Sequence, residues 1–134
     1  MRQMFLMTLV AVLAGAARPA HAEPTCAVSV GQGANYIDAV THAMDGKSCG
    51  EASQIAEGCM MAASGDVAIA GRATEICRKD FARNKADKAL FTKLTQRCEK
   101  KFRGMDGTMY ISARAFCALD VARLLSSLNL GPDE

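Results

Sequence analysis

Six cysteines are the residues of this chain that most plainly could do chemistry. They are Cys26, Cys49, Cys59, Cys77, Cys98 and Cys117. No two of them form a Cys-x-x-Cys pair, the spacing typical of redox dithiols, zinc knuckles and covalent haem sites. Widely spaced cysteines in even number are typical of the disulfide framework of a small exported protein. We therefore expect three structural disulfides instead of a reactive thiol or a metal site.

His42 is the second candidate for chemistry. Asp38 precedes it by four residues and Asp45 follows it by three, so a helix would place both carboxylates on the imidazole's face. Such a triplet could bind a metal ion, or pair a general base with the carboxylate that orients it. No serine or free cysteine is placed as its nucleophile, so an ordinary exposed ion pair is our expectation. A small hydrolase that uses His42 is a lesser alternative.

Several methionines raise the question of a copper(I) site, because thioethers suit soft metals. They are Met44, Met60, Met61, Met105 and Met109. Tight Met-x-x-Met repeats are missing from this set, so packing in the core and scatter on the surface are the expected roles. The sequence thus predicts no catalytic residue, no metal and no cofactor.

The first 22 residues have the pattern of a cleavable export signal. Arg2 provides a positive start, residues 4–17 are apolar, and Ala20-His21-Ala22 is a small-x-small cleavage site. The apolar stretch is too short for a transmembrane helix, and nothing downstream approaches ~18 uninterrupted apolar residues. We expect residues 23–134 to form a single domain without a membrane span, in the bacterial periplasm or the outside medium.

Charge is nearly balanced over the whole chain but unevenly distributed along it. The chain has 16 Lys and Arg against 14 Asp and Glu, which gives no general attraction to nucleic acid or to an anionic membrane. Residues 23–77 hold two basic and seven acidic side chains, whereas residues 78–134 hold twelve basic and seven acidic. The basic excess within 78–103 predicts either a solvated helical surface, laced with salt bridges, or a face that binds an acidic partner or an anionic envelope polymer.

Apolar residues recur at spacings of three and four, which predicts helices, and no segment of useful length alternates with period two. Five helical segments are expected. The first spans about 34–45, the second runs from the Ser48–Glu51 capping box to Gly65, the third is capped by Asp66, the fourth follows a break at 84–87, and the last runs from Thr108 to Gly131. The expected fold is all-α, a small disulfide-stapled array of four to five short helices.

The last segment has the cleanest apolar stripe, which predicts its core face. The stripe consists of Tyr110, Ala113, Cys117, Val121, Leu124 and Leu128. A turn near Asp106 would fold this segment back on the fourth and bring Cys98 level with Cys117, which is our preferred disulfide. Cys49 and Cys77 are comparably level across the turn at Gly65, which would leave Cys26 for Cys59. Other pairings of these four cysteines stay open.

Four short stretches of the C-terminal third carry a family resemblance. They are Leu94-Thr95-Gln96-Arg97-Cys98, Gly107-Thr108-Met109-Tyr110, Ala115-Phe116-Cys117 and Arg123-Leu124-Leu125. Together they resemble the second half of the LprI-type lysozyme-inhibitor family, which consists of small, exported, cysteine-stapled helical proteins of bacteria. The family usually has a tryptophan after the Gln-Arg pair, where this chain has Cys98. The resemblance implies a periplasmic protein that binds a lysozyme-like enzyme.

Export, a disulfide-locked scaffold and segregated charge favour a binding or interaction protein without catalytic activity. Its expected partner is a protein, either a lysozyme-like cell-wall hydrolase that it inhibits or to which it gives immunity, or another envelope protein. Because lysozymes are commonly basic, the expected contacts are the acidic residues Asp38, Asp45, Glu51 and Glu57. The alternative is a carrier of a small envelope ligand, with an anionic head group held by Lys93, Arg97, Lys100 and Arg103. The sequence leaves the oligomeric state open.

Overall fold

The computed structural model describes residues 25–31 and 34–129, and the expected export signal at 1–22 lies outside these residues. Five helices form the described part: α1 (Tyr36–Ala43), α2 (Cys49–Gly58), α3 (Asp66–Phe81), α4 (Lys85–Lys101) and α5 (Thr108–Asn129). They account for 71% of the described residues, which include no strand. The all-α prediction is confirmed. Among the described helices, none combines the length and the apolar character needed to cross a bilayer.

The helix starts follow from short polar side chains that bind free backbone amides. Ser48 forms the predicted capping box with Glu51 at the start of α2. Asn35 and Asn84 cap α1 and α4 by accepting from backbone N–H groups one turn later. The expectation that α2 continues to Gly65 is wrong, because this helix ends at Gly58 and a turn follows.

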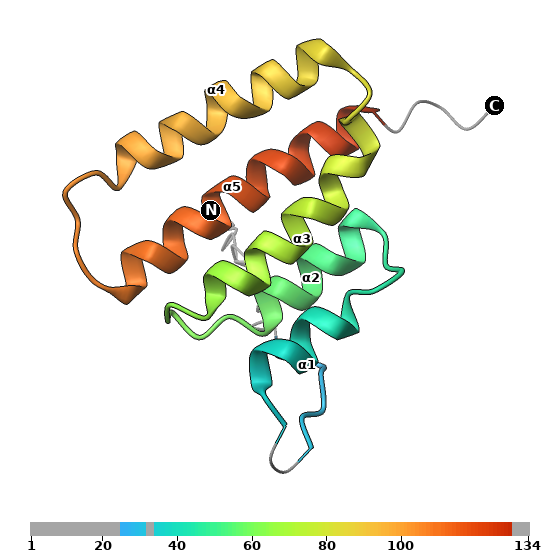
Figure 1. Ribbon diagram of the computed structural model, residues 1–134, viewed down its shortest axis with the longest axis vertical. Helices are drawn as coiled ribbons and strands as arrows, with labels where there is room; N and C mark the ends of the chain where they lie inside the picture. Colours follow the sequence, from blue (N-terminus) through green and yellow to red (C-terminus); the bar gives the residue numbers. More distant parts are fainter. Residues whose placement is uncertain (1–24, 32–33, 130–134) are drawn as a thin grey trace, which may run out of the picture.

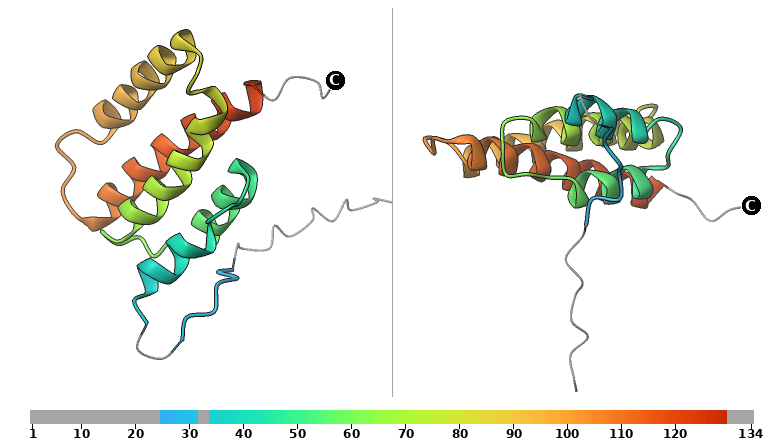
Figure 2. Two further views of the ribbon diagram at one scale, coloured as in Figure 1. Left: turned by 45° about the vertical axis from the view of Figure 1, so that its right-hand side comes forward. Right: turned by 90° about the horizontal axis from the view of Figure 1, so that it is seen from below.

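Helix α3 is the centre of the array, with α1, α2 and α5 packed against it. Helix α4 lies at one edge and packs along α5, while α1 lies at the opposite edge (Figure 1). Helices α3 and α5 run in the same direction, and α4 runs antiparallel to both (Figure 1). Seen from below, the end of the hairpin that joins α4 to α5 extends beyond the other helices (Figure 2).

The interface between α3 and α5 is held in register by two serine–aspartate hydrogen bonds. Ser112 donates to Asp66 near the start of both helices, at 2.6 Å, and Ser126 donates to Asp80 near their ends. Each pair is separated by 46 residues, so the parallel register is constant along the interface. Small and medium side chains fill the space between the two bonds: Ile69, Ala70, Ala73 and Cys77 on α3, and Leu119, Ala122 and Leu125 on α5. This interface forms one side of the core, to which α1 and α2 contribute Val40, Ala52 and Ala56.

Three disulfides join the helices, and all three expected pairs are confirmed. They are Cys26–Cys59, Cys49–Cys77 and Cys98–Cys117. The first attaches the N-terminal segment to the end of α2, the second joins the start of α2 to α3 inside the core, and the third joins α4 to α5. Tyr36 on α1 supports the first bridge, because its hydroxyl donates to the Cys59 carbonyl at 2.8 Å. Burial, with a smaller contribution from the Asp66 charge, raises the pKa of this hydroxyl.

The predicted core face of α5 is wrong at its C-terminal end. Leu124 is 53% exposed and Leu128 is 70% exposed, although both belong to the cleanest apolar stripe. The residues of α5 that are buried are Ser112, Leu119, Ala122, Leu125 and Ser126. Because α5 contacts α2, α3 and α4, it carries apolar residues on several sides. The apolar periodicity identified the stripe of α5 that contains Cys117, which is bonded to α4. The residues of α5 that are buried lie on another side of the helix.

Candidate functional site

His42 lies at the surface and pairs with one of its two neighbouring carboxylates, Asp45. The imidazole Nδ1 lies 3.1 Å from Asp45 Oδ2, and the His42 side chain is 89% exposed. Asp45 is held more closely by Arg72, whose Nη2 lies 2.6 Å from its Oδ1. The hydrogen bond from Arg72 lowers the pKa of Asp45. Within the described residues, no group of three or more His, Cys, Asp or Glu side chains could hold a metal ion.

The four acidic candidates are spread over separate parts of α1 and α2, and three of them are engaged within the molecule. Asp45 pairs with Arg72, and Glu57 lies 2.6 Å from Arg123 on α5. Glu51 serves the capping box, where the Ser48 backbone amide and then the Ser48 hydroxyl lower its pKa. Of these four candidates, only Asp38 shows no ion pair among the described residues. The acidic half therefore presents a surface whose charge is largely neutralised.

The basic candidates, unlike three of the four acidic ones, have no ion pairs among the described residues. Lys93, Arg97 and Lys100 are spaced by four and three residues and lie exposed on one side of α4, which we name the basic face. Arg103 lies in the turn just beyond the helix and is also exposed. The ion pairs of the described residues all lie elsewhere, on His42, Lys47, Arg72, Arg114 and Arg123. The one carboxylate of α4 in an ion pair, Glu99, is taken by Arg114 of α5.

No basic residue of the segment 78–103 takes part in an ion pair, as far as the described residues show. Two of its cations are placed over aromatic rings: Arg78 lies 5.3 Å from the centre of Phe91, and Lys101 lies 5.3 Å from that of Phe102. The solvated surface expected for α4 is present, but among the described residues its salt bridges are limited to Glu99 with Arg114. The sequence shows that basic residues are concentrated in this segment. Whether they have acidic partners depends on where the carboxylates of other helices lie in the fold.

Two cavities stand out among the described residues, and neither is lined by α4. One of about 400 Å³ lies between the N-terminal segment and α2, beside Thr25, Lys47 and Ile55. The other, of about 370 Å³, lies where the start of α2 meets the ends of α3 and α5. A carrier that holds the head group of an enclosed ligand would need the basic face at the mouth of a cavity. The basic face is not at the mouth of either of these two cavities.

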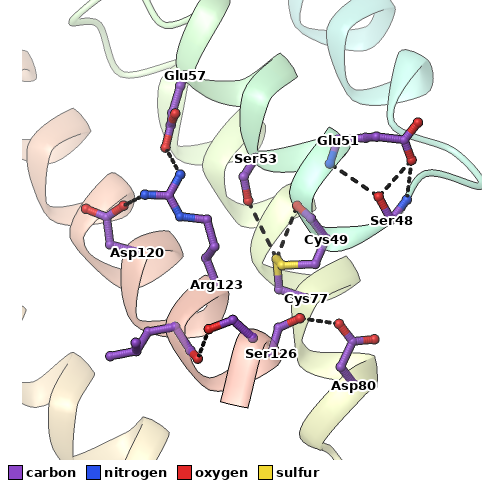
Figure 3. Close-up of a disulfide and its surroundings, with 12 residues drawn as sticks. Ser48, Cys49, Glu51, Ser53, Glu57, Cys77, Asp80, Asp120, Arg123 and Ser126 are labelled. Atoms are coloured by element: carbon purple, nitrogen blue, oxygen red, sulfur yellow. Dashed lines mark hydrogen bonds and ion pairs between the residues drawn. A yellow bond between two sulfur atoms is a disulfide. The ribbon is translucent and has the colours of Figure 1, made fainter. Parts of the chain in front are cut away.

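The second cavity lies beside the Cys49–Cys77 bridge and is lined by polar side chains (Figure 3). Ser126 donates to Asp80, and Arg123 reaches both Glu57 and Asp120 (Figure 3). A serine next to a carboxylate lacks the base that a nucleophile requires, since His42 belongs to α1 and pairs with Asp45. These contacts join α2, α3 and α5 and explain the cluster as a structural one.

The methionines separate into one core residue and four surface residues. Met44 is fully buried, whereas Met60, Met61, Met105 and Met109 are each about half exposed, from 47% to 58%. Met60 and Met61 lie in the α2–α3 connection, and Met105 and Met109 lie in or next to the α4–α5 connection. Their placement agrees with the expectation of core packing and surface scatter.

The fold and surface together define a small, disulfide-stapled, five-helix protein with a basic edge helix. Comparison with protein-family models, with curated proteins and with solved structures gives no match. The properties of the chain itself therefore carry the functional argument.

Proposed function

We propose that this protein is a binding protein of the bacterial periplasm or the outside medium, and that it binds an anionic partner through the basic face of α4. Three disulfides suit an oxidising compartment, where such bonds form and persist. The export signal expected at residues 1–22 would deliver the chain there. The compact, stapled scaffold would then present one charged helix at its edge.

The observation that supports this proposal is the difference between paired and unpaired charges. Four carboxylates of the α1–α3 half, Asp45, Glu51, Glu57 and Glu75, have basic partners, whereas the basic residues of α4 have no ion pair within the described residues. Lys93 and Arg97 are neighbours of like charge on one helix face, an arrangement that weakens an isolated helix. An anionic partner would relieve this repulsion on binding, so the surface is complementary to negative charge.

Two variants of equal charge test the proposal with soluble anions. K93Q/R97Q removes two cations from the basic face, whereas K79Q/R83Q removes two exposed cations near the end of α3. Binding of the oxidised chain to polyglutamate and to inorganic polyphosphate would be measured by titration calorimetry at two salt concentrations. We expect K93Q/R97Q to weaken binding roughly thirtyfold and the control much less, because each close cation contributes about 1 kcal/mol and the two together about 2 kcal/mol. Equal affinities of the two variants would contradict a binding surface on α4.

The narrower proposal, inhibition of a lysozyme-like hydrolase, needs an acidic surface to meet a basic enzyme. Asp38 would be its free contact, because Asp45 and Glu57 are paired with arginines. A lysis assay with lysozyme and a molar excess of the protein tests this version. Slower lysis that is restored in D38N would support it, and unchanged lysis would reject it while leaving the basic-face proposal untouched.

A further inference from the structure

Exposed leucines lie beside the basic face, on the hairpin formed by α4 and α5. Leu90 on α4 is 40% exposed, and Leu124 and Leu128 on α5 are 53% and 70% exposed. We name these three residues the leucine patch. The Cys98–Cys117 bridge sets the antiparallel register, so residues before Cys98 lie beside residues after Cys117 (Figure 1). Leu90 and Leu124, eight and seven residues from the bridge, therefore lie at a similar level along the hairpin.

The leucines of the patch do not point in the direction of the side chains that contact α3. Phe91 points toward α3, because its ring lies 5.7 Å from that of Phe81. Leu90, one residue earlier, is turned by about 100° from that direction. On α5, Ser126 points toward α3 through its bond to Asp80, and Leu124 lies two residues earlier. Leu128 follows Leu124 by one turn and shares its side of the helix.

The basic face borders this patch. Lys93 and Arg97 follow Leu90 by three and seven residues, so the three side chains form one stripe along α4. The stems of Lys93 and Arg97 are long enough to lie over apolar surface while their charged ends extend outward. The hairpin thus combines protruding leucines with cations that have no ion pair in the described structure. The net charge of the whole chain is small and does not reveal this local concentration of cations beside leucines.

We propose that the α4–α5 hairpin docks on an anionic phospholipid surface, with the leucine patch inserted among the lipids and the basic face against their phosphates. This inference rests on the proposed function and names the partner class of the same site. Protruding leucines suit a deformable lipid interface, and neither of the two cavities offers a groove here for a peptide. A second copy docked on the same patch would bring Lys93 and Arg97 of both copies together, which like-charge repulsion opposes.

Vesicle flotation with the oxidised full chain tests the inference. The vesicles would be of phosphatidylcholine, with and without about 30% phosphatidylglycerol, in about 0.1 M salt. We expect binding only to the anionic vesicles, and at least a roughly tenfold weaker partition for K93Q/R97Q. L124Q/L128Q should weaken partition by a similar factor, because it removes the apolar part of the contact. Its matched control is M60Q/M61Q, which removes two half-exposed apolar side chains from the α2–α3 connection and should partition like the unsubstituted chain.

The outcomes distinguish this inference from the proposed function. Binding to polyglutamate or polyphosphate without binding to anionic vesicles would overturn the lipid partner and keep the basic face as a binding surface. Vesicle binding that is unchanged in L124Q/L128Q would also overturn the inserted patch. A dimer in solution that only L124Q/L128Q dissociates would assign the patch to a second copy. Failure to bind any of the three anions would overturn both proposals. Far-ultraviolet circular dichroism would confirm that each variant is folded.

Discussion

Helices α2 and α4 are each attached to a neighbour by a disulfide, and they use their side chains in opposite ways. Helix α2 has ten residues, buries four of them, and has its acidic residues in a cap and an ion pair. Helix α4 has 17 residues but buries only Cys98. Its one paired charge is Glu99. A helix that is longer yet contributes less to the core leaves most of its surface for contacts outside the molecule.

Removal of the two helix-attaching disulfides should give the largest and most unequal effects. Loop closure predicts about 3–4 kcal/mol for either bridge, from 28 residues in Cys49–Cys77 and 19 in Cys98–Cys117. C49S/C77S also disturbs the core, because Cys77 is fully buried, so we expect it to unfold most of the molecule. C98S/C117S should release α4 alone.

Amide hydrogen exchange measures this difference helix by helix. In C98S/C117S we expect protection to be lost in α4 and retained in α2 and α3. Loss of protection in all five helices of C98S/C117S would show that α4 is as much a part of the cooperative core as α2. The inference that α4 contributes less to the folded core than α2 would then be wrong.

Replacement of the two aspartates that bridge α3 to α5 should give the next largest effect. Asp66 is fully buried and accepts from the amides of Met61 and Ala63, at 3.0 and 3.2 Å, as well as from Ser112. D66A would leave these donors unpaired inside the protein, so we expect a loss of about 3 kcal/mol in urea denaturation. D80A, whose carboxylate is exposed, is the matched control and should lose less than about 1 kcal/mol.

Equal losses in D66A and D80A would contradict this reading of the interface. They would mean that the bonds at its two ends contribute equally and that burial at the start of α3 has no special role. S112A, which leaves the two backbone donors paired with Asp66, should fall between the two aspartate variants.

Features set by neighbours in the sequence could be predicted, and features set by distant neighbours could not. The Ser48 capping box and the all-helical content depend on local chemistry, and the disulfides on turns whose positions the sequence marks. Asp66 was expected to cap α3, but its side chain folds back to Met61 and Ala63 and across to α5. The basic segment was visible in the sequence. Its lack of partners was not, because pairs such as Glu57–Arg123 join residues 66 positions apart.

Acid should weaken the side-chain cap of α2 but not that of α4. The Ser48 amide and hydroxyl lower the pKa of Glu51 below its ordinary 4.5, so the cap stabilises the protein above that pH. The stabilisation is lost as pH falls through the lowered folded-state pKa. Helix α4 is capped by Asn84, which does not titrate.

Hydrogen exchange of the Glu51 and Asp87 amides between pH 5 and about pH 3 checks this contrast. We expect protection at Glu51 to fall with acid relative to that at Asp87, once the intrinsic exchange rates are corrected. E51Q should remove most of this pH dependence, because the glutamine stays neutral. A fall in protection at Glu51 that persists unchanged in E51Q would assign the acid sensitivity to another carboxylate.

The smallest effect should come from the basic face, and its sign separates a binding surface from a structural one. Lys93 and Arg97 are four residues apart on α4 and repel each other, so K93Q/R97Q should leave stability unchanged or raise it by about 0.2–0.5 kcal/mol. R72Q, which breaks the pairs of Arg72 with Asp45 and Glu75, should instead lower the melting temperature. Thermal denaturation at low and high salt measures both, and added salt should shrink both changes. A clear loss in K93Q/R97Q would mean that the face serves the fold. A gain in stability combined with a loss of anion binding would show that Lys93 and Arg97 serve binding and lower the stability of the folded protein.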